Sequence, residues 1–261
     1  MGYLRLLIQQ LRMSILLALQ YRLDFVVGAL LSLIWIAAAL VPLVVLFSQR
    51  SAVAGWRWHE ALIVVGFFTA LKGVLDGAIR PALQDVVERI RLGTLDYVLI
   101  KPADAQFLVS TTRFELFRVV DVVAGIALVV IALAYGGHWP SAAAIALCLL
   151  LLFAAALILY AIWIMVLCLA FIAVKVDNLS FLFASIYDAA RWPAGIYRGV
   201  VSFVFTFVIP LAVMTTYPAL ALLERLSAQR TLSALATALV FALLARVAWL
   251  ASIRRYTSAG G

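Results

Sequence analysis

Long apolar runs separated by short polar segments dominate the chain. The runs are continuous and rich in Leu and Ala, and they are expected to form helices at about 25–47, 60–78, 115–135, 141–174, 178–192 and 232–253. A membrane core of ~30 Å takes roughly 20 apolar residues per helix, whereas a membrane β-barrel would show short alternating strands. The pattern therefore predicts an all-α integral membrane protein with six transmembrane helices.

The first 24 residues have a different pattern. Arg5, Gln9 and Arg12 recur on one helical face, and leucines and isoleucines form another. Such an amphipathic helix can lie in the membrane interface, although the same residues could simply extend the first span. Because charges interrupt the apolar residues, this segment is not expected to be a cleavable signal.

Residues 193–231 are largely apolar but are interrupted by proline. Pro210 and Pro218 disfavour one continuous helix, so we expect a re-entrant hairpin that enters and leaves the membrane from one side. Broken backbone at that depth has to be covered by protein or line a cavity. The alternative is a full span at about 199–220, which would place 178–192 on the surface or move the C-terminus to the other side.

A patterned polar segment, 79–113, separates the second and third spans. Pro81 suits the first turn of a helix, Asp85 and Arg89 have the spacing of an ion pair, and Gly93 is a plausible C-terminal cap. These features predict a short amphipathic helix. It could lie flat on lipid headgroups, or it could dock a cytoplasmic protein through its apolar face and mixed charges.

Composition supports the membrane assignment. Hydrophobic residues make up 67% of the chain and charged residues 12%, and the net charge is +8; the mean hydropathy is +1.15. The loops that would be cytoplasmic if both termini were inside contain most of the Lys and Arg, so we expect both termini in the cytoplasm. This distribution explains the basic balance, and nucleic acid is not an expected partner.

Several charges lie within or beside the expected spans. Lys72, Arg118 and Arg246 fall inside them. Arg118 and Asp121 are three residues apart, as are Asp188 and Arg191. Because a charge at membrane depth is costly and usually paired, each set could be an internal ion pair; alternatively, an aspartate could attract a cationic cargo.

The chain offers few residues for chemistry of its own. Cys148 and Cys168 are too far apart on one helix to bridge, and the two histidines are isolated, so no metal site or other cofactor is expected. None of the three lysines ends a Gly-rich phosphate-binding loop. If ATP and Mg²⁺ are used, a separate polypeptide must bind them. A scaffold or assembly factor, or a lipid-modifying membrane enzyme, remains an alternative.

Two motifs resemble those of a known family. The first pattern is I-x-x-G-x-L-D-x-x-L-x-K-P, fitted by Ile90, Gly93, Leu95, Asp96, Leu99, Lys101 and Pro102. The second pattern is P-x-x-I-Y followed by F-x-x-P and Y-P, fitted by Pro193, Ile196, Tyr197, Phe207, Pro210, Tyr217 and Pro218. Together with the order of spans, they resemble the permease subunits of type 2 ATP-binding-cassette (ABC) exporters, within a bacterial subfamily that includes viologen-exporter-like permeases. Lys175 and Asp177 are a weaker match, to the basic-acidic pair that begins the fifth span in the wider superfamily.

The resemblance implies a membrane subunit of the bacterial inner membrane that exports an amphipathic or hydrophobic cargo, such as a cationic drug, a lipid or a peptide. It implies two ATPase subunits per complex and a second permease copy or paralogue. Residues implied to couple to the ATPase are Asp85, Glu88, Arg89, Arg91, Gly93, Leu95, Asp96, Lys101 and Pro102. Residues implied to form a re-entrant gate are Pro193, Tyr197, Pro210, Tyr217 and Pro218.

The expected single permease domain divides by function. Its parts are an interfacial helix at 1–24, two spans at 25–78, a coupling segment at 79–113, three spans at 115–192, the re-entrant segment at 193–231, the last span at 232–253 and a cytoplasmic tail at 254–261.

Overall fold

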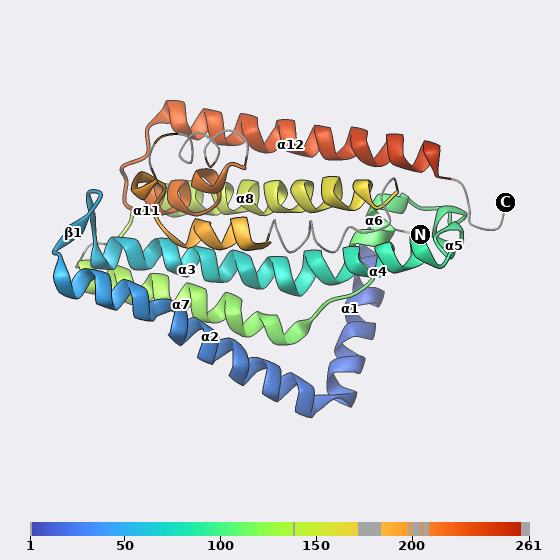
Figure 1. Ribbon diagram of the computed structural model, residues 1–261, viewed down its shortest axis with the longest axis horizontal. Coiled ribbons are helices and arrows are strands. Elements are labelled where there is room, and N and C mark those ends of the chain that lie inside the picture. The colour runs from blue at the N-terminus through green and yellow to red at the C-terminus, as the bar shows by residue number, and fades with distance from the viewer. Residues whose placement is uncertain are drawn as a thin grey trace.

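Five long helices run in roughly the same direction and define the shape of the molecule (Figure 1). The computed structural model describes residues 2–137, 139–171, 184–197, 199, 205 and 209–256. The long helices are α2 (Arg22–Gln49), α3 (Trp58–Val74), α7 (Val119–Gly136), α8 (Ala142–Leu169) and α12 (Ala228–Arg255). α1 (Tyr3–Gln20) is as long as α7 but does not run with this group, and the short helices are α4 (Arg80–Arg91), α5 (Asp96–Leu99), α6 (Ala105–Ser110) and α11 (Tyr217–Leu222). Strands β1 (Ala52–Val53) and β2 (Trp56–Arg57) pair as an antiparallel hairpin.

The protein is an all-α integral membrane protein, as predicted. Five described helices are long and apolar enough to cross a membrane: Arg22–Gln49, Trp58–Arg91, Leu116–Gly136, Ala142–Leu169 and Ala228–Arg255. Each overlaps one predicted span. Of the span predicted at 178–192, only 184–192 is described; it is helical to Asp188 and continues as the 3₁₀ turn η3 (Ala189–Arg191). The other residues of that prediction lie outside the described residues, as do Lys175, Asp177 and Phe207.

The second span and the polar helix are continuous in the structure. α3 continues into α4 through one π turn, η1 (Leu75–Ile79), so that Trp58–Arg91 is one uninterrupted helical rod. Pro81 lies within the first turn after η1. A proline ring clashes with the carbonyl one turn earlier in a regular α-helix, and the wider π turn accommodates it. The proline therefore marks a change of helical geometry and does not start a separate helix.

The two ends of the bundle differ in composition. One end contains the β1–β2 hairpin and α11; the other contains α4, α5, α6 and the ends of the chain at α1 and α12 (Figure 1). We call these the hairpin end and the connector end, and residues 79–113 the connector. Ion pairing of Glu60 with Arg225 at 2.7 Å joins elements at the hairpin end. Ring contact of Phe171 with Tyr256, 5.8 Å between centroids, joins α8 and α12 at the connector end.

The ends of the described chain lie close to one another along the bundle. α1 begins at the connector end, and α8 and α12 both run from the hairpin end to the connector end (Figure 1). Because 172–183 and much of 198–208 lie outside the described residues, the total number of crossings stays a prediction, and so does the side that is cytoplasmic.

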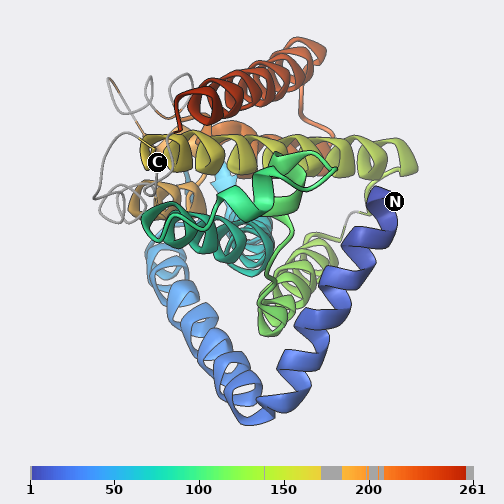
Figure 2. The same cartoon turned by 90° about the vertical axis from the view of Figure 1, so that its right-hand side faces the viewer.

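α1 lies at a steep angle to the long helices and crosses the bundle at the connector end (Figures 1 and 2). One hydrogen bond joins it to the connector, from the Asp104 amide to the Tyr3 hydroxyl at 3.4 Å, and a second, from the Phe114 amide to Ser14 Oγ at 3.3 Å, joins it to the residue that follows the connector. A helix lying in the plane of a membrane interface would have this orientation.

α3 is the most buried of the five candidate spans, and glycine lets it approach α7 closely. A Cβ added at Gly125 would lie 2.5 Å from both the Gly66 carbonyl oxygen and the Ala70 nitrogen. A Cβ at Gly66 would lie 2.7 Å from the Gly125 carbonyl oxygen. Small residues that bring backbones together are the usual means of helix association in membranes. The two helices are thus packed backbone to backbone.

Replacing Gly125 by alanine should force these helices apart. We expect the free energy of unfolding to fall by about 1–3 kcal/mol, the usual cost of overpacking, and the thermal midpoint in detergent to fall with it. Gly195→Ala is the control, because a Cβ there has no neighbour closer than 3.8 Å. Equal midpoints for the two variants would contradict the packing described.

Candidate functional site

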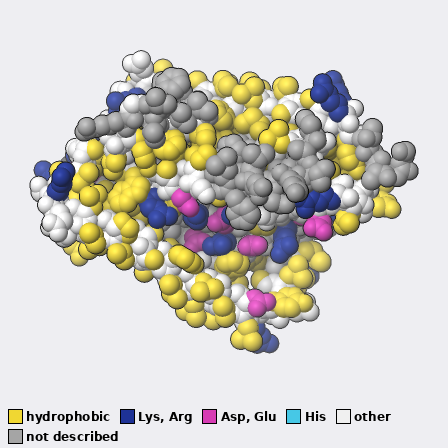
Figure 3. Space-filling view, viewed as in Figure 1, with side chains coloured by type: hydrophobic (Ala, Val, Ile, Leu, Met, Phe, Trp, Pro, Cys, Tyr) yellow, Lys and Arg dark blue, Asp and Glu magenta, His cyan; other side chains and the backbone are white. Residues whose placement is uncertain are grey.

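A cavity of about 480 Å³ lies between α2, α3, the start of α7 and residues 188–191. Charged side chains line it, and we call it the charged cavity: Lys72, Asp76, Arg118, Asp121, Asp188 and Arg191. On this face of the molecule, basic and acidic side chains gather in a central hollow bordered by hydrophobic ones (Figure 3). Lys72 is 14 residues into the span that begins at Trp58, which is ~21 Å at the helical rise of about 1.5 Å per residue. The charges thus lie at membrane depth.

Every carboxylate of the cavity has a basic partner. Lys72 Nζ lies 2.7 Å from Asp188 Oδ1, and Arg191 Nη2 approaches the same oxygen at 3.9 Å. Arg118 Nη1 donates to Asp121 Oδ2 at 3.2 Å. Of the four residues singled out from the sequence, Arg118 and Asp121 pair as one interpretation suggested. The main partner of Asp188 is Lys72, whose role the sequence did not indicate.

Asp76 is also paired, but with a residue outside the cavity. Arg80 Nη1 donates to Asp76 Oδ1 at 3.0 Å across the π turn η1. The pair therefore joins the wall of the cavity to the first residue of α4. Charges at membrane depth are stable when paired in this way.

Two arginine nitrogens at the cavity have no acceptor. Among the described residues, Arg118 Nε and Arg191 Nε are buried and make no hydrogen bond. Aromatic rings lie nearby: the Arg191 guanidinium is 5.3 Å from the Phe68 ring centroid, and that of Arg118 is 4.9 Å from Phe117. A buried N–H without an acceptor costs free energy, so these donors are poised for a ligand atom or water.

The five residues expected to form a gate lie in two segments that are joined through threonine hydroxyl groups. The Thr215 hydroxyl donates to the Ala190 carbonyl at 2.7 Å, and the Ala194 amide donates to Thr216 Oγ1 at 3.1 Å. Both threonines belong to a second π turn, η6 (Ala212–Thr216), which is wholly buried and contacts α3 and α8. The two segments contain the five residues of that prediction, Pro193, Tyr197, Pro210, Tyr217 and Pro218. Broken helical backbone is covered by protein here, as the membrane requires.

Tyr197 and the prolines have identifiable local roles. The Tyr197 hydroxyl donates to the Ala189 carbonyl at 2.7 Å. Pro193, Pro210 and Pro218 are buried, and Pro218 lies in the first turn of α11. Whether 193–231 forms a re-entrant hairpin stays a prediction, since much of 198–208 lies outside the described residues.

The coupling residues proposed from the motif divide into inward-facing and outward-facing groups. Leu95 is fully buried, and Arg89 Nε donates to Asp85 Oδ2 within α4 at 2.7 Å. Gly93 ends α4 with a φ of +67°, as its predicted capping role requires. Asp96 begins α5 and is partly exposed. The exposed members are Glu88, Arg91, Lys101 and Pro102.

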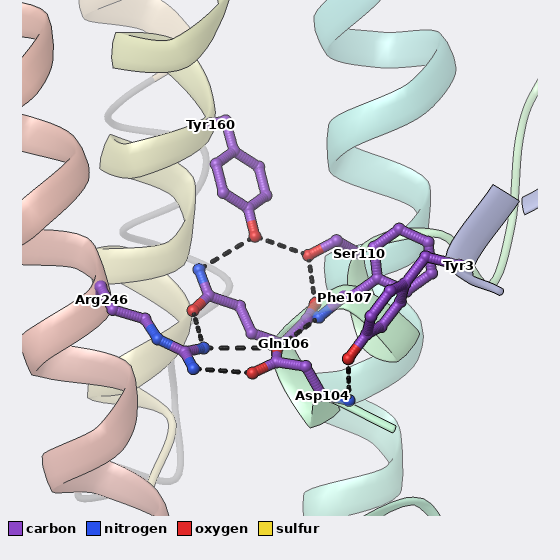
Figure 4. A network of polar contacts seen from close by, with 7 residues as sticks. All are labelled: Tyr3, Asp104, Gln106, Phe107, Ser110, Tyr160 and Arg246. Atoms are coloured by element: carbon purple, nitrogen blue, oxygen red, sulfur yellow. Dashed lines mark hydrogen bonds and ion pairs between the residues drawn. The ribbon is translucent and has the colours of Figure 1, made fainter. Parts of the chain in front are cut away.

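A polar network that the sequence analysis did not identify joins the connector to the last span (Figure 4). Arg246 on α12 donates to both carboxylate oxygens of Asp104, at 2.6 and 3.3 Å, and to Gln106 Oε1 at 2.8 Å. Gln106 Nε2 in turn donates to the Tyr160 hydroxyl of α8 at 3.0 Å, which also bonds Ser110. We call this network the clamp. The available signal was Arg246, a basic residue in an otherwise apolar span.

Asp104 also caps α6, since its carboxylate accepts from the Phe107 amide at 3.0 Å. The hydrogen bond from Arg246 holds the pKa of the Asp104 carboxyl below its ordinary value. A carboxyl with a lowered pKa contributes its stabilisation above its unfolded-state pKa and loses it as the pH falls through the lowered value. The clamp should therefore remain ionised throughout the neutral and mildly acidic range.

Glu60 and Arg225, at the hairpin end, were also missed. The Glu60 side chain is buried and accepts from the Arg57 amide at 3.0 Å, while Arg225 lies 2.7 Å away. The pair holds the end of α11 against the start of α3. In the part of the chain that the structure describes, no group of three or more His, Cys, Asp or Glu side chains could hold a metal ion.

Comparison with known proteins gives one match. A family model described as ABC-2 family transporter protein matches residues 33–260, which is most of the chain. No curated protein and no solved structure matches it.

Removing the basic group of the clamp should loosen the connector. In an Arg246→Gln variant, we expect amide hydrogen exchange in residues 104–110 to rise about tenfold or more, because a hydrogen bond to a charged group contributes roughly 1.5–3 kcal/mol. Arg254→Gln, exposed on the same helix, is the matched control. Wild-type protection in that segment should be the same at pH 5 and pH 8 after correction for intrinsic exchange. Unchanged exchange in Arg246→Gln would show that the clamp does not hold α6.

Proposed function

Because the chain belongs to the ABC-2 family of transporter proteins, we propose that it is the membrane subunit of an exporter and that its connector end docks the ATPase. The family establishes a membrane subunit of an ABC transporter and implies an ABC ATPase as partner. The direction of transport, the docking surface and the cargo path belong to the proposal.

The observation that carries the docking proposal is an exposed apolar patch on the connector. Leu92, Tyr97 and Ile100 are 66%, 69% and 77% exposed, although they lie beyond the apolar spans. Their neighbours Leu95 and Val98 are buried and fix the patch to the bundle. We call Leu92, Tyr97 and Ile100 the connector patch.

Charges of both signs surround the connector patch. Glu88, Arg91, Lys101 and Pro102 are exposed beside it. An apolar centre with a mixed polar rim is the anatomy of a protein interface. Anionic headgroups would favour basic residues alone, so the acidic member Glu88 favours a protein partner over the lipid surface.

The assembly that follows has two such permeases, identical or paralogous, and two ATPase subunits. ATP and Mg²⁺ would be bound by the ATPases. Both termini and the connector would face the cytoplasm of a bacterium, with the spans in the inner membrane. Movement of the ATPases would reach α3 directly through the uninterrupted Trp58–Arg91 rod and α12 through the clamp.

Substitutions in the connector patch test the docking surface. In a Tyr97→Ser, Ile100→Ser double variant, we expect the ATPase to be lost when the tagged chain is purified from its native cells in mild detergent. Trp139→Ser is the matched control, because Trp139 is 64% exposed between α7 and α8, at the hairpin end. The control should retain the ATPase at about one per permease.

The alternatives give different results. If the wild-type chain is purified without an ATPase under conditions that preserve other membrane complexes, a scaffold or lipid-modifying enzyme becomes the better reading. If the ATPase remains bound to the double variant, the connector patch is not the docking surface. Reversing Arg89 is a less specific test, since Arg89 also stabilises α4 through Asp85.

A further inference from the structure

We propose that the charged cavity binds the anionic headgroup, a phosphate, sulfonate or carboxylate, of an amphiphilic cargo. This inference deepens the proposed function and rests on it, because the bound molecule is a cargo only if the protein is a transporter subunit that moves it. It goes against the expectation that Asp121 or Asp188 attracts a cation. Both carboxylates are already paired with basic side chains of the protein.

The balance of charge in the cavity is the first argument. Arg118 is matched by Asp121, and Asp76 is matched by Arg80 from outside the cavity. Asp188, however, is shared by two cations, Lys72 and Arg191. The described lining residues carry three positive and three negative charges, and Arg80, which pairs with Asp76 from outside, brings the total of this group to one positive charge in excess. At membrane depth such a charge is costly, and an anion is what would compensate it.

The hydrogen-bond donors are the second argument. Arg118 Nε and Arg191 Nε are buried, and the described residues provide no acceptor for either. Lys72 bonds only one of the two carboxylate oxygens of Asp188 in the contacts described. Guanidinium groups bind the oxygens of phosphate and carboxylate with two parallel hydrogen bonds. A tetrahedral or planar oxyanion would thus satisfy donors that the protein leaves open.

The apolar part of the lining is the third argument. Trp35, Ile36 and Phe68 line the cavity beside the charges. Trp35 lies on α2 and is 73% exposed. Few residues of α2 are buried in the bundle. A cavity with a charged floor and an apolar side toward the lipid fits a molecule with an anionic head and a hydrocarbon tail.

Photolabelling can test this on the purified full-length chain in a neutral detergent. The probe is decyl phosphate with a diazirine in its chain, and labelled peptides are mapped by mass spectrometry. We expect saturable labelling of α2 near Trp35. Unlabelled decyl phosphate should compete at a concentration at least about tenfold lower than decyltrimethylammonium, because hydrogen bonds to a charged group discriminate by that much or more.

Variants connect the labelling to the cavity. Arg191→Gln and Lys72→Gln should each weaken decyl phosphate binding about tenfold or more, whereas Lys72→Arg should retain it. Asp188→Asn should strengthen it, since the carboxylate that competes for the two cations is removed. Arg230→Gln is the charge-matched control, because Arg230 is exposed at the start of α12, far from the cavity.

Two outcomes would overturn the inference. One is equal or better competition by decyltrimethylammonium on the wild-type chain, a comparison that needs no variant to fold. The other is undiminished labelling in a monodisperse Arg191→Gln variant. Because the measurement needs no ATPase, its failure is distinct from failure of the proposed function, which is judged by ATPase co-purification.

Discussion

A charge at membrane depth has to find a partner, and this constraint organises the interior of the protein. Four carboxylates along the spans and their edges, Asp76, Asp121, Asp188 and Glu60, are each held by Arg or Lys. The pairs of Asp76 and Asp121 are local, but those of Asp188 and Glu60 join elements that are far apart in sequence, such as α3 with residues 188–191. The cost of an unpaired charge in hydrocarbon is what gives such contacts their hold on the tertiary structure.

The same constraint governs the backbone. Chain that leaves regular helical geometry within the membrane must be covered, and both described π turns, η1 and η6, are buried against other helices. η1 brings Pro81 into a continuous rod, and η6 precedes Pro218 at the start of α11. In both places a proline would break a regular helix. A π turn next to the proline lets the chain remain helical. The neighbouring helices then cover the backbone groups that the irregular turn would otherwise expose to lipid.

Sequence periodicity predicted the helices well and the contacts between them poorly. In a membrane protein the length of an apolar run determines where a spanning helix lies, so α7 and α12 were predicted nearly to their ends. The glycine cap at Gly93 was predictable because only local geometry decides it. The continuity of α3 with α4 was not, since proline punctuates most helices and the compensating π turn has no clear sequence signature. Arg246 and Lys72 were visible as charges in apolar runs, but their partners Asp104 and Asp188 are more than 100 residues away, and periodicity contains no information at that separation.

The contact between Gly66 and Gly125 also determines how the charged cavity could change its size. Its α3 and α7 walls touch through backbone atoms, and sliding them would force main chain against main chain. The two helices therefore move together as one rigid body. The remaining walls are α2, which is the least buried of the five candidate spans, and residues 188–191. Alternation between an open and a closed cavity would then be a hinge movement of α2 relative to the α3–α7 pair. The hinge would be the short turn at Tyr21 between α1 and α2.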